Sequence, residues 1–200
     1  MADETGLIGE LGAWVMGEAA RCTASWRALG HDIGLRVNVS AHELRGNGFV
    51  DSVLAAVEEA GISPHHLGIE VTESTLVDDD KTTQDNLARL SEAGICLLVD
   101  DFGTGYSSLS YLERFPVVDV LKVDRSFLVE GTRGRAVVQA VVGLARAFGF
   151  EVCAEGVETP EQLAYLHDLG CDLAQGFYLA RPVPVDAVDE LLAGWTVPAS

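Results

Sequence analysis

The chain has few basic residues and no long uncharged apolar run. Its 200 residues hold 13 Lys and Arg against 31 Asp and Glu, which gives a formal net charge of −18. A surface this acidic repels phosphate polymers, so we expect no binding of nucleic-acid polymers. A run of about 18 apolar residues, as a membrane-spanning helix needs, is missing, and so is a signal peptide. We expect no membrane attachment by this chain itself.

The four cysteines show no C-x-x-C spacing, so no metal or redox motif can be read from them. Cys96 and Cys153 fall inside apolar, strand-like runs, where a reduced thiol serves as a small hydrophobic side chain. A reducing, cytoplasmic location fits this usage best.

Six apolar segments alternate with segments of helical spacing. The expected strands are 35–40, 67–72, 95–101, 118–124, 151–155 and 173–179. The expected helices include one that runs to Trp26 and others near 80–93, 106–115, 134–148 and 185–193. Near-continuous apolar strands between helices are typical of a parallel sheet covered on both faces. We therefore predict an α/β fold and one domain over residues 1–200.

Local signals fix some details of this pattern. Thr159-Pro160-Glu161-Gln162 predicts a helix start with Thr at the N-cap and Gln at the third helical position, and Gly170 predicts its end. Trp14 and Trp26 follow a helical apolar stripe and are expected in the core. His65 and His66 precede a strand, so we expect them at the end of the sheet opposite to function.

Polar side chains gather where the expected strands end. In chain order they are Asn38 and Ser40, Glu70 and Glu73, Asp100 and Asp101, Lys122 and Asp124, Glu155 and Glu158, and, inside the last strand, Gln175. In a parallel α/β barrel the carboxyl ends of the strands converge on one mouth, where active sites lie. One such acid alone usually caps a helix, but six strand ends in succession indicate a shared site.

The adjacent carboxylates Asp100 and Asp101 are the sharpest element of this set. Two neighbouring carboxylates repel each other unless cations neutralise them. With Asn38, Glu70 and Glu155 they form an oxygen-rich set suited to Mg²⁺ or Mn²⁺. Two such ions can hold a phosphodiester for attack by an activated water, and Lys122 could orient that water.

The segment Phe102-Gly103-Thr104-Gly105-Tyr106-Ser107-Ser108 is a Gly-rich loop. It does not complete the dinucleotide pattern G-x-G-x-x-G. Asp-Phe-Gly also occurs in kinases, but the H-R-D catalytic loop of a kinase is absent from this sequence.

The motifs as an ordered set resemble those of the EAL-type cyclic-di-GMP phosphodiesterases. They are Asn38-Val39-Ser40, Glu70-Val71-Thr72-Glu73, Asp100 to Ser108, Leu121-Lys122-Val123-Asp124, Ala154-Glu155-Gly156-Val157-Glu158 and Gln175-Gly176-Phe177. They follow the family's order and span nearly the whole chain. The resemblance implies a modified TIM (β/α)8 barrel that hydrolyses cyclic-di-GMP to linear pGpG with Mg²⁺ or Mn²⁺ in a two-metal site.

The resemblance also assigns roles by motif position. It implies metal ligation by Asn38, Glu70, Asp100, Asp101 and Glu155, and management of the attacking water by Lys122, Glu158 and Gln175. It implies that Glu73 anchors the Gly-rich loop. Arg125 and Arg181 lie near these motifs in the sequence and are candidates for contact with phosphate or guanine, with a plain surface role equally open.

The sequence departs from the family in one respect, because it contains no Glu-Ala-Leu motif, whose Glu is a metal ligand in the family. The resemblance implies an incomplete barrel with about six of eight strands, which lacks the first two. Unpaired strand edges invite association between chains. We therefore expect a homo-oligomer or strand exchange, and weak or absent hydrolysis by this chain alone.

Two other readings stay open. A catalytically inactive module that binds cyclic-di-GMP or a protein fits the missing Glu, whereas Asp100-Asp101, Lys122 and Glu155 favour descent from an enzyme. An enolase-like lyase would share the Lys and the carboxylates at the strand ends but not the motif set. The sequence leaves open whether Met1 is the native start and whether sensor or cyclase domains precede it.

Overall fold

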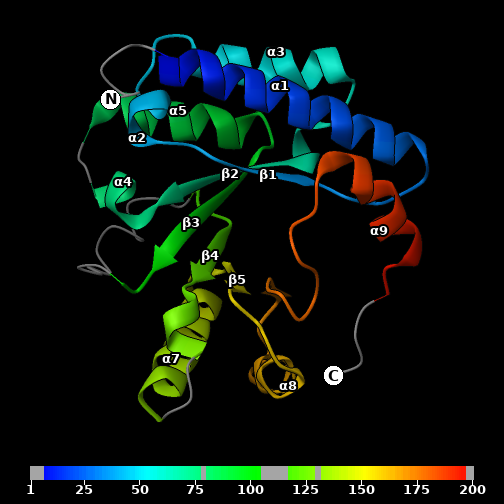
Figure 1. Ribbon diagram of the computed structural model, residues 1–200. Coiled ribbons are helices and arrows are strands. Elements are labelled where there is room, and N and C mark those ends of the chain that lie inside the picture. Colours follow the sequence, from blue (N-terminus) through cyan, green and yellow to red (C-terminus); the bar gives the residue numbers. More distant parts are fainter. Residues whose placement is uncertain (1–6, 78–79, 105–116, 129–131, 197–200) are drawn as a thin grey trace. The chain divides into compact units, whose positions relative to one another are not determined.

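The computed structural model describes residues 7–77, 80–104, 117–128 and 132–196 (Figure 1). The chain forms two compact units, and each is described by itself. The N-terminal unit holds Met1–Leu98 and Glu113–Val117, and the C-terminal unit holds Val99–Leu112 and Val118–Ser200. Within the described ranges, no helix has both the length and the apolar character that crossing a membrane requires.

The N-terminal unit alternates helices with two complete strands. Its elements are α1 (Leu7–Ala28), β1 (Leu35–Asn38), α2 (Ala41–Leu44), α3 (Phe49–Ala60), η1 (Pro64–His66), β2 (Leu67–Thr72), α4 (Glu73–Val77), α5 (Lys81–Glu92) and the start of β3 (Cys96–Phe102). β1 and β2 are parallel, with Leu35 opposite Leu67 and Asn38 opposite Glu70. Helices α1 and α3 pack side by side (Figure 1).

The core of this unit is apolar. α3 buries Val50, Val53 and Val57, which recur at helical spacing on one face. β2 is buried along its length except at Thr72, as expected for a parallel strand covered on both faces. One polar contact crosses this core, because the buried Asn86 amide of α5 donates a 2.7 Å hydrogen bond to the Leu44 carbonyl of α2.

The C-terminal unit continues the same alternation. Its elements are the rest of β3, β4 (Val120–Val123), η2 (Arg125–Leu128), α7 (Thr132–Phe148), β5 (Glu151–Ala154), α8 (Pro160–Leu169), β6 (Leu173–Ala174), η3 (Val185–Ala187) and α9 (Val188–Gly194). β4 pairs in parallel with β5, and β5 with β6. The six strands follow their chain order in the sheet, from β1 to β6.

The predicted α/β alternation and the six strands are confirmed, and two boundaries differ from the predicted ones by more than two residues. The last strand ends at Ala174 instead of 179, because the chain turns at Gly176, whose carbonyl accepts hydrogen bonds from the amides of Leu179 and Ala180. The last α-helix begins at Val188, after a 3₁₀ turn. The helix predicted at 106–115 lies outside the described residues.

The prediction that Trp14 belongs to the core was wrong. Its side chain is 62% exposed, together with Leu11 and Val15 on the same face of α1, and Trp26 is half-buried. α1 packs instead through Met16, Ala20 and Thr23. Of the two stripes on this helix, the one with Met16, Ala20 and Thr23 is buried, and the one with Leu11, Trp14 and Val15 is exposed.

The capping signals were read correctly. Thr159 and Gln162 form the predicted capping box at the start of α8, with Pro160 in the first helical position. Gly170 ends that helix at φ 69°, a left-handed conformation that glycine adopts without steric cost. His65 and His66 lie in η1, directly before β2, as expected.

Candidate metal centre

Three carboxylates of the C-terminal unit lie close together. Asp100, Asp101 and Glu155 each offer an oxygen, and these oxygens all lie within 4.8 Å of one another. Asp100 and Asp101 stand near the end of β3, and Glu155 directly follows β5. The expected convergence of strand-end carboxylates is therefore present in this unit.

Lys122 holds two of these carboxylates. Its ammonium lies 3.1 Å from Asp100 Oδ1 and 2.7 Å from Glu155 Oε1, although its side chain is almost completely buried. β4 places it there, since all four residues of the strand are buried and Lys122 stands opposite Cys153 of β5. A buried ammonium is tolerated only when it is paired, so these two carboxylates also stabilise the fold around Lys122.

Asp101 carries both electrostatic and backbone strain. Burial raises the pKa of its carboxyl group, and the charges of Asp100 and Asp124 raise it further, while Lys122 opposes the shift. Its φ of 55° lies in the left-handed region, which an Asp occupies more readily than most residues. Thr104 stabilises this turn, because its amide and hydroxyl donate to the Asp101 carbonyl at 3.2 and 2.8 Å.

Asp124 has the opposite behaviour. The hydroxyl and amide of Ser126 lower the pKa of its carboxyl group, and the amide lies 3.0 Å from Asp124 Oδ1. Asp124 therefore keeps its negative charge to lower pH than an ordinary Asp, and this charge acts on Asp101. Asp124 was predicted from the sequence to lie at a strand end and was given no role. Its spacing of two residues from Ser126 could have predicted the hydrogen bond that lowers the pKa of its carboxyl group.

The donor chemistry of the cluster fits a hard divalent cation. All three clustered donors are carboxylate oxygens, which Mg²⁺, Mn²⁺ and Ca²⁺ prefer over nitrogen and sulfur. A cation among them would remove the repulsion that raises the pKa of Asp101.

In the N-terminal unit, two predicted ligands stand side by side. Asn38 of β1 and Glu70 of β2 are register partners, so their side chains leave the sheet on the same face. Glu70 is 6% exposed, whereas Asn38 is exposed. Glu73 is also buried, in the first position of α4.

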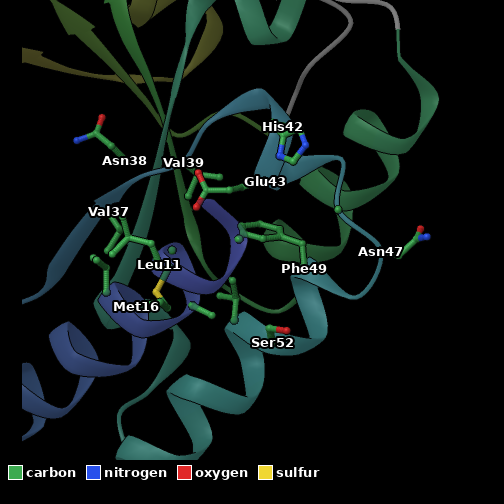
Figure 2. Close-up of a pocket in the computed structure, with 16 residues that line it drawn as sticks. Leu11, Met16, Val37, Asn38, Val39, His42, Glu43, Asn47, Phe49 and Ser52 are labelled. Atoms are coloured by element: carbon green, nitrogen blue, oxygen red, sulfur yellow. The ribbon is translucent and has the colours of Figure 1, made fainter. Parts of the chain in front are cut away.

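An apolar cavity of about 470 Å³ lies beside Asn38 within the same unit (Figure 2). α1, β1, α2 and α3 line it, with Met16, Val37 and Phe49 among its walls. The Asn38 side chain points away from Met16 and Val37, while Glu43 reaches in among the lining residues (Figure 2). The residues that line the cavity include none of the three clustered carboxylates.

The remaining candidates of the C-terminal unit lie on exposed segments. The backbone of Gln175 is hydrogen-bonded to Ala154, which precedes Glu155, and to Val157, two residues after Glu155. The Glu158 amide donates to Gln162 at 2.7 Å. The Arg181 guanidinium lies over the Phe177 ring, 4.7 Å from its centroid.

Arg125 begins η2, and its Cβ lies close to Gly156. The structure therefore brings Asp100, Lys122 and Glu155 into side-chain contact, with an oxygen of Asp101 within 4.8 Å of those of the two other carboxylates. It also brings Gln175 and Arg125 to the segment that carries Glu155. The part of the Gly-rich loop from Gly105 to Ser108 lies outside the described residues.

The sequence of the chain is similar to that of two curated cyclic di-GMP phosphodiesterases. The chain is 41% identical over its full length to the cyclic di-GMP phosphodiesterase NbdA of Pseudomonas aeruginosa, of which it covers 26%. It is 44% identical over 93% of its length to the bifunctional diguanylate cyclase/cyclic di-GMP phosphodiesterase MucR of the same species, of which it covers 28%. It thus spans between a quarter and a third of these relatives.

Solved structures of cyclic-di-GMP-binding proteins also resemble the fold of this chain. The MucR phosphodiesterase in complex with c-di-GMP matches 94% of this chain and 77% of its own, at 43% identity and a TM-score of 0.87. The manganese/c-di-GMP complex of Klebsiella pneumoniae BlrP1 matches 87% of this chain and 44% of its own, at 31% identity and a TM-score of 0.78. The EAL domain family matches residues 1–182 of the sequence. The chain belongs to the EAL domain family.

Proposed function

We propose that this chain hydrolyses cyclic-di-GMP to linear pGpG at a centre of two divalent ions, Mg²⁺ or Mn²⁺. The observation that carries the proposal is the cluster of Asp100, Asp101 and Glu155 around the buried Lys122. The named activity of NbdA and the manganese/c-di-GMP complex of BlrP1 support it. Because the family match runs from residue 1 to 182, we treat the chain as one functional domain.

Asp100, Asp101 and Glu155 would hold the ions, and motif position assigns Asn38 and Glu70 as further ligands. When bound, the ions supply Lewis acidity toward the phosphodiester. The carboxylates also exclude a second anion from the site until cations offset their charge, so binding of the substrate requires binding of metal first.

Lys122 orients the attacking water and places positive charge beside the phosphate. Its ammonium is held by Asp100 and Glu155, so it enters the reaction already aligned. Glu158 and Gln175 complete the hydrogen bonds of that water, and Glu73 anchors the Gly-rich loop. In the reaction the water oxygen bonds to phosphorus, the bond from phosphorus to the 3′ oxygen breaks, and the leaving oxygen gains a proton.

Two arginines supply contacts to the substrate. Arg125 offers a guanidinium from the segment after β4, and guanidinium groups pair with phosphate through two parallel hydrogen bonds. Arg181 and the half-exposed Phe177 form a stacked surface suited to the flat face of guanine.

We propose that turnover by this chain alone is slow, because its 200 residues contain no Glu-Ala-Leu glutamate. A second candidate function follows from the same observation. The chain then binds cyclic-di-GMP through its metal-holding residues without hydrolysing it.

The test compares wild type with Asp101→Asn. Mn²⁺ affinity is measured by calorimetry, and pGpG formation by chromatography. We expect Asp101→Asn to weaken Mn²⁺ binding and to abolish whatever turnover the wild type has. Asp168→Asn, an exposed carboxylate on α8, is the matched control and should change neither.

If Asp101→Asn binds Mn²⁺ and forms product as the wild type does, the proposed centre is wrong. Wild-type binding of cyclic-di-GMP with Ca²⁺ or Mn²⁺ but no pGpG supports the binding module instead.

We also propose that the chain self-associates through the N-terminal unit. β1 lies at one end of the strand order and pairs with β2 on one side only, as far as the described strands go. The exposed Leu11, Trp14 and Val15 stand on α1, which packs against β1 and lines the cavity of Figure 2. The exposed Trp14 indole and the cavity lined by the same helix form an apolar surface that can pack against the same surface of a second copy across a two-fold axis.

Sedimentation tests this association. The net charge of −18 repels a second copy, so the dimer should strengthen when salt rises above ~0.1 M, where the Debye length falls below ~10 Å. Trp14→Glu should shift the chain to monomer, and Val185→Glu, an exposed apolar residue of the C-terminal unit, should not. A wild type that stays monomeric at all concentrations contradicts the proposal.

A further inference from the structure

The segment that carries Glu155 is hydrogen-bonded on both sides. On one side the Glu155 amide donates to the Val123 carbonyl of β4 at 3.0 Å. On the other, the Val157 amide donates to the Gln175 carbonyl at 3.0 Å, and its carbonyl accepts from the Tyr178 amide at 2.9 Å. The Gln175 amide donates to the Ala154 carbonyl at 2.8 Å. The residues after β6 therefore clamp the chain immediately around Glu155.

This clamp requires a residue without a side chain at position 176, and that residue is Gly176. A Cβ on Gly176 would lie 2.2 Å from both the backbone nitrogen and the carbonyl oxygen of Val157. These are backbone atoms of a residue that is fully buried, so they cannot swing aside as the end of a flexible side chain would. Any side chain at position 176 must push Val157 away or break its hydrogen bonds to Gln175 and Tyr178.

A second glycine completes the arrangement on the other side. Gly156 has φ 68°, a conformation that favours glycine, and a Cβ there would lie 2.3 Å from the Cβ of Arg125. Glu155 thus directly precedes Gly156, which lies close to Arg125, and stands two residues before Val157, which lies close to Gly176. Its carboxylate meets Lys122 at 2.7 Å, which leaves little freedom at either end of the residue.

We infer that Gly176 is a positioning residue, which sets the place of the Glu155 carboxylate through the backbone of Val157. The inference rests on the proposed function in one respect, namely that Glu155 holds a metal ion. Metal ligands must keep their place to within about 0.5 Å, so a displaced Val157 weakens the centre without removing any donor atom. The three atoms nearest to a Cβ at position 176 all belong to the backbone of Val157, so the effect passes through that backbone.

The experiment measures the Mn²⁺ affinity of the whole chain by calorimetry, together with thermal unfolding. Gly176→Ala should weaken Mn²⁺ binding by about 10- to 100-fold, the range found for residues that support metal ligands. Gly143→Ala is the matched control, because nothing lies within 4 Å of a Cβ at that position of α7. It should leave the affinity unchanged.

Glu155→Gln separates the two proposals. If it binds Mn²⁺ as tightly as wild type, Glu155 is not a ligand and the proposed centre fails at that residue. If Glu155→Gln is weakened but Gly176→Ala keeps wild-type affinity, the positioning inference is wrong while the centre stands. A Gly176→Ala variant that loses thermal stability only, with unchanged affinity, likewise overturns it.

A measurement on the wild type guards against a variant that fails to fold. Amide hydrogen exchange at Val157 and Tyr178 should slow when Mg²⁺ is added, because fixing Glu155 also fixes the clamp. Exchange at the Val53 amide, inside α3 of the N-terminal unit, serves as the internal reference. Equal exchange of the clamp amides with and without Mg²⁺ contradicts the inference.

Discussion

Leu90 of the N-terminal unit and Lys122 of the C-terminal unit are both almost completely buried, but different forces hold them. Leu90 belongs to an apolar core that needs no partner atom in particular. Lys122 depends on two named carboxylates, at 2.7 and 3.1 Å. The comparison indicates that the burial of Leu90 does not depend on any one polar partner, whereas the burial of Lys122 depends on Asp100 and Glu155.

The largest effect is expected from Lys122→Met, which keeps the length of the side chain and removes its charge. Asp100 and Glu155 then face each other without a cation, and loss of one partner of a buried pair costs about 3–5 kcal/mol of unfolding free energy. Urea unfolding measures this loss, and turnover should disappear as well.

Adding Mg²⁺ should return part of the lost stability to Lys122→Met, because a cation replaces the missing charge. If, without metal, the variant unfolds at the same urea concentration as the wild type, the ion pairs of Lys122 do not stabilise the fold.

Leu90→Ala tests the apolar half. The cavity left in the N-terminal core should cost about 2–5 kcal/mol of unfolding free energy, while the Mn²⁺ affinity stays at the wild-type value. Leu29→Ala, at a side chain that is 67% exposed, is the control and should change the stability by less than about 0.5 kcal/mol. A fall in Mn²⁺ affinity in Leu90→Ala would show that the two kinds of interaction are coupled.

The smallest effect is expected from Asp80→Ala at the start of α5. Asp80 accepts hydrogen bonds from the amide and hydroxyl of Thr83 at 2.8 and 2.9 Å, and these lower the pKa of its carboxyl group below the usual 3.8. Because the pKa of Asp80 is lower in the folded chain than in the unfolded chain, its carboxylate stabilises the fold at pH values above the unfolded pKa. This stabilisation is lost as the pH falls through the folded pKa.

The thermal midpoint of Asp80→Ala should therefore lie slightly below that of wild type at neutral pH. The difference should narrow as pH falls below about 4, where the unfolded carboxyl group begins to protonate. A difference that stays constant down to acid pH would mean that the charge of Asp80 plays no part.

Features set by neighbouring residues could be predicted from the sequence. Thr159 and Gln162 form a local hydrogen-bonded unit, so the start of α8 follows from four letters. The convergence of Asp100 and Glu155 also follows, because parallel strands bring their carboxyl ends to one edge. The capping box follows from local geometry, and the convergence follows from the regular geometry of a parallel sheet.

Features set by distant contacts could not be predicted. Whether Trp14 or Met16 faces the core depends on how closely α1 approaches its neighbours, and both stripes are apolar. The end of β6 depends on Gly176 meeting the backbone of Val157, some twenty residues earlier in the chain. The sequence marked Lys122 as a catalytic candidate, but not its almost complete burial.

The left-handed backbone of Asp101 restricts this position in two independent ways. Its φ of 55° favours Gly, Asn or Asp, whereas the proposed centre requires a carboxylate. Asp is the residue that satisfies both demands. Saturation mutagenesis at this codon should accordingly give two different outcomes, with Gly and Asn enriched under selection for solubility and Asp alone surviving under selection for cleavage.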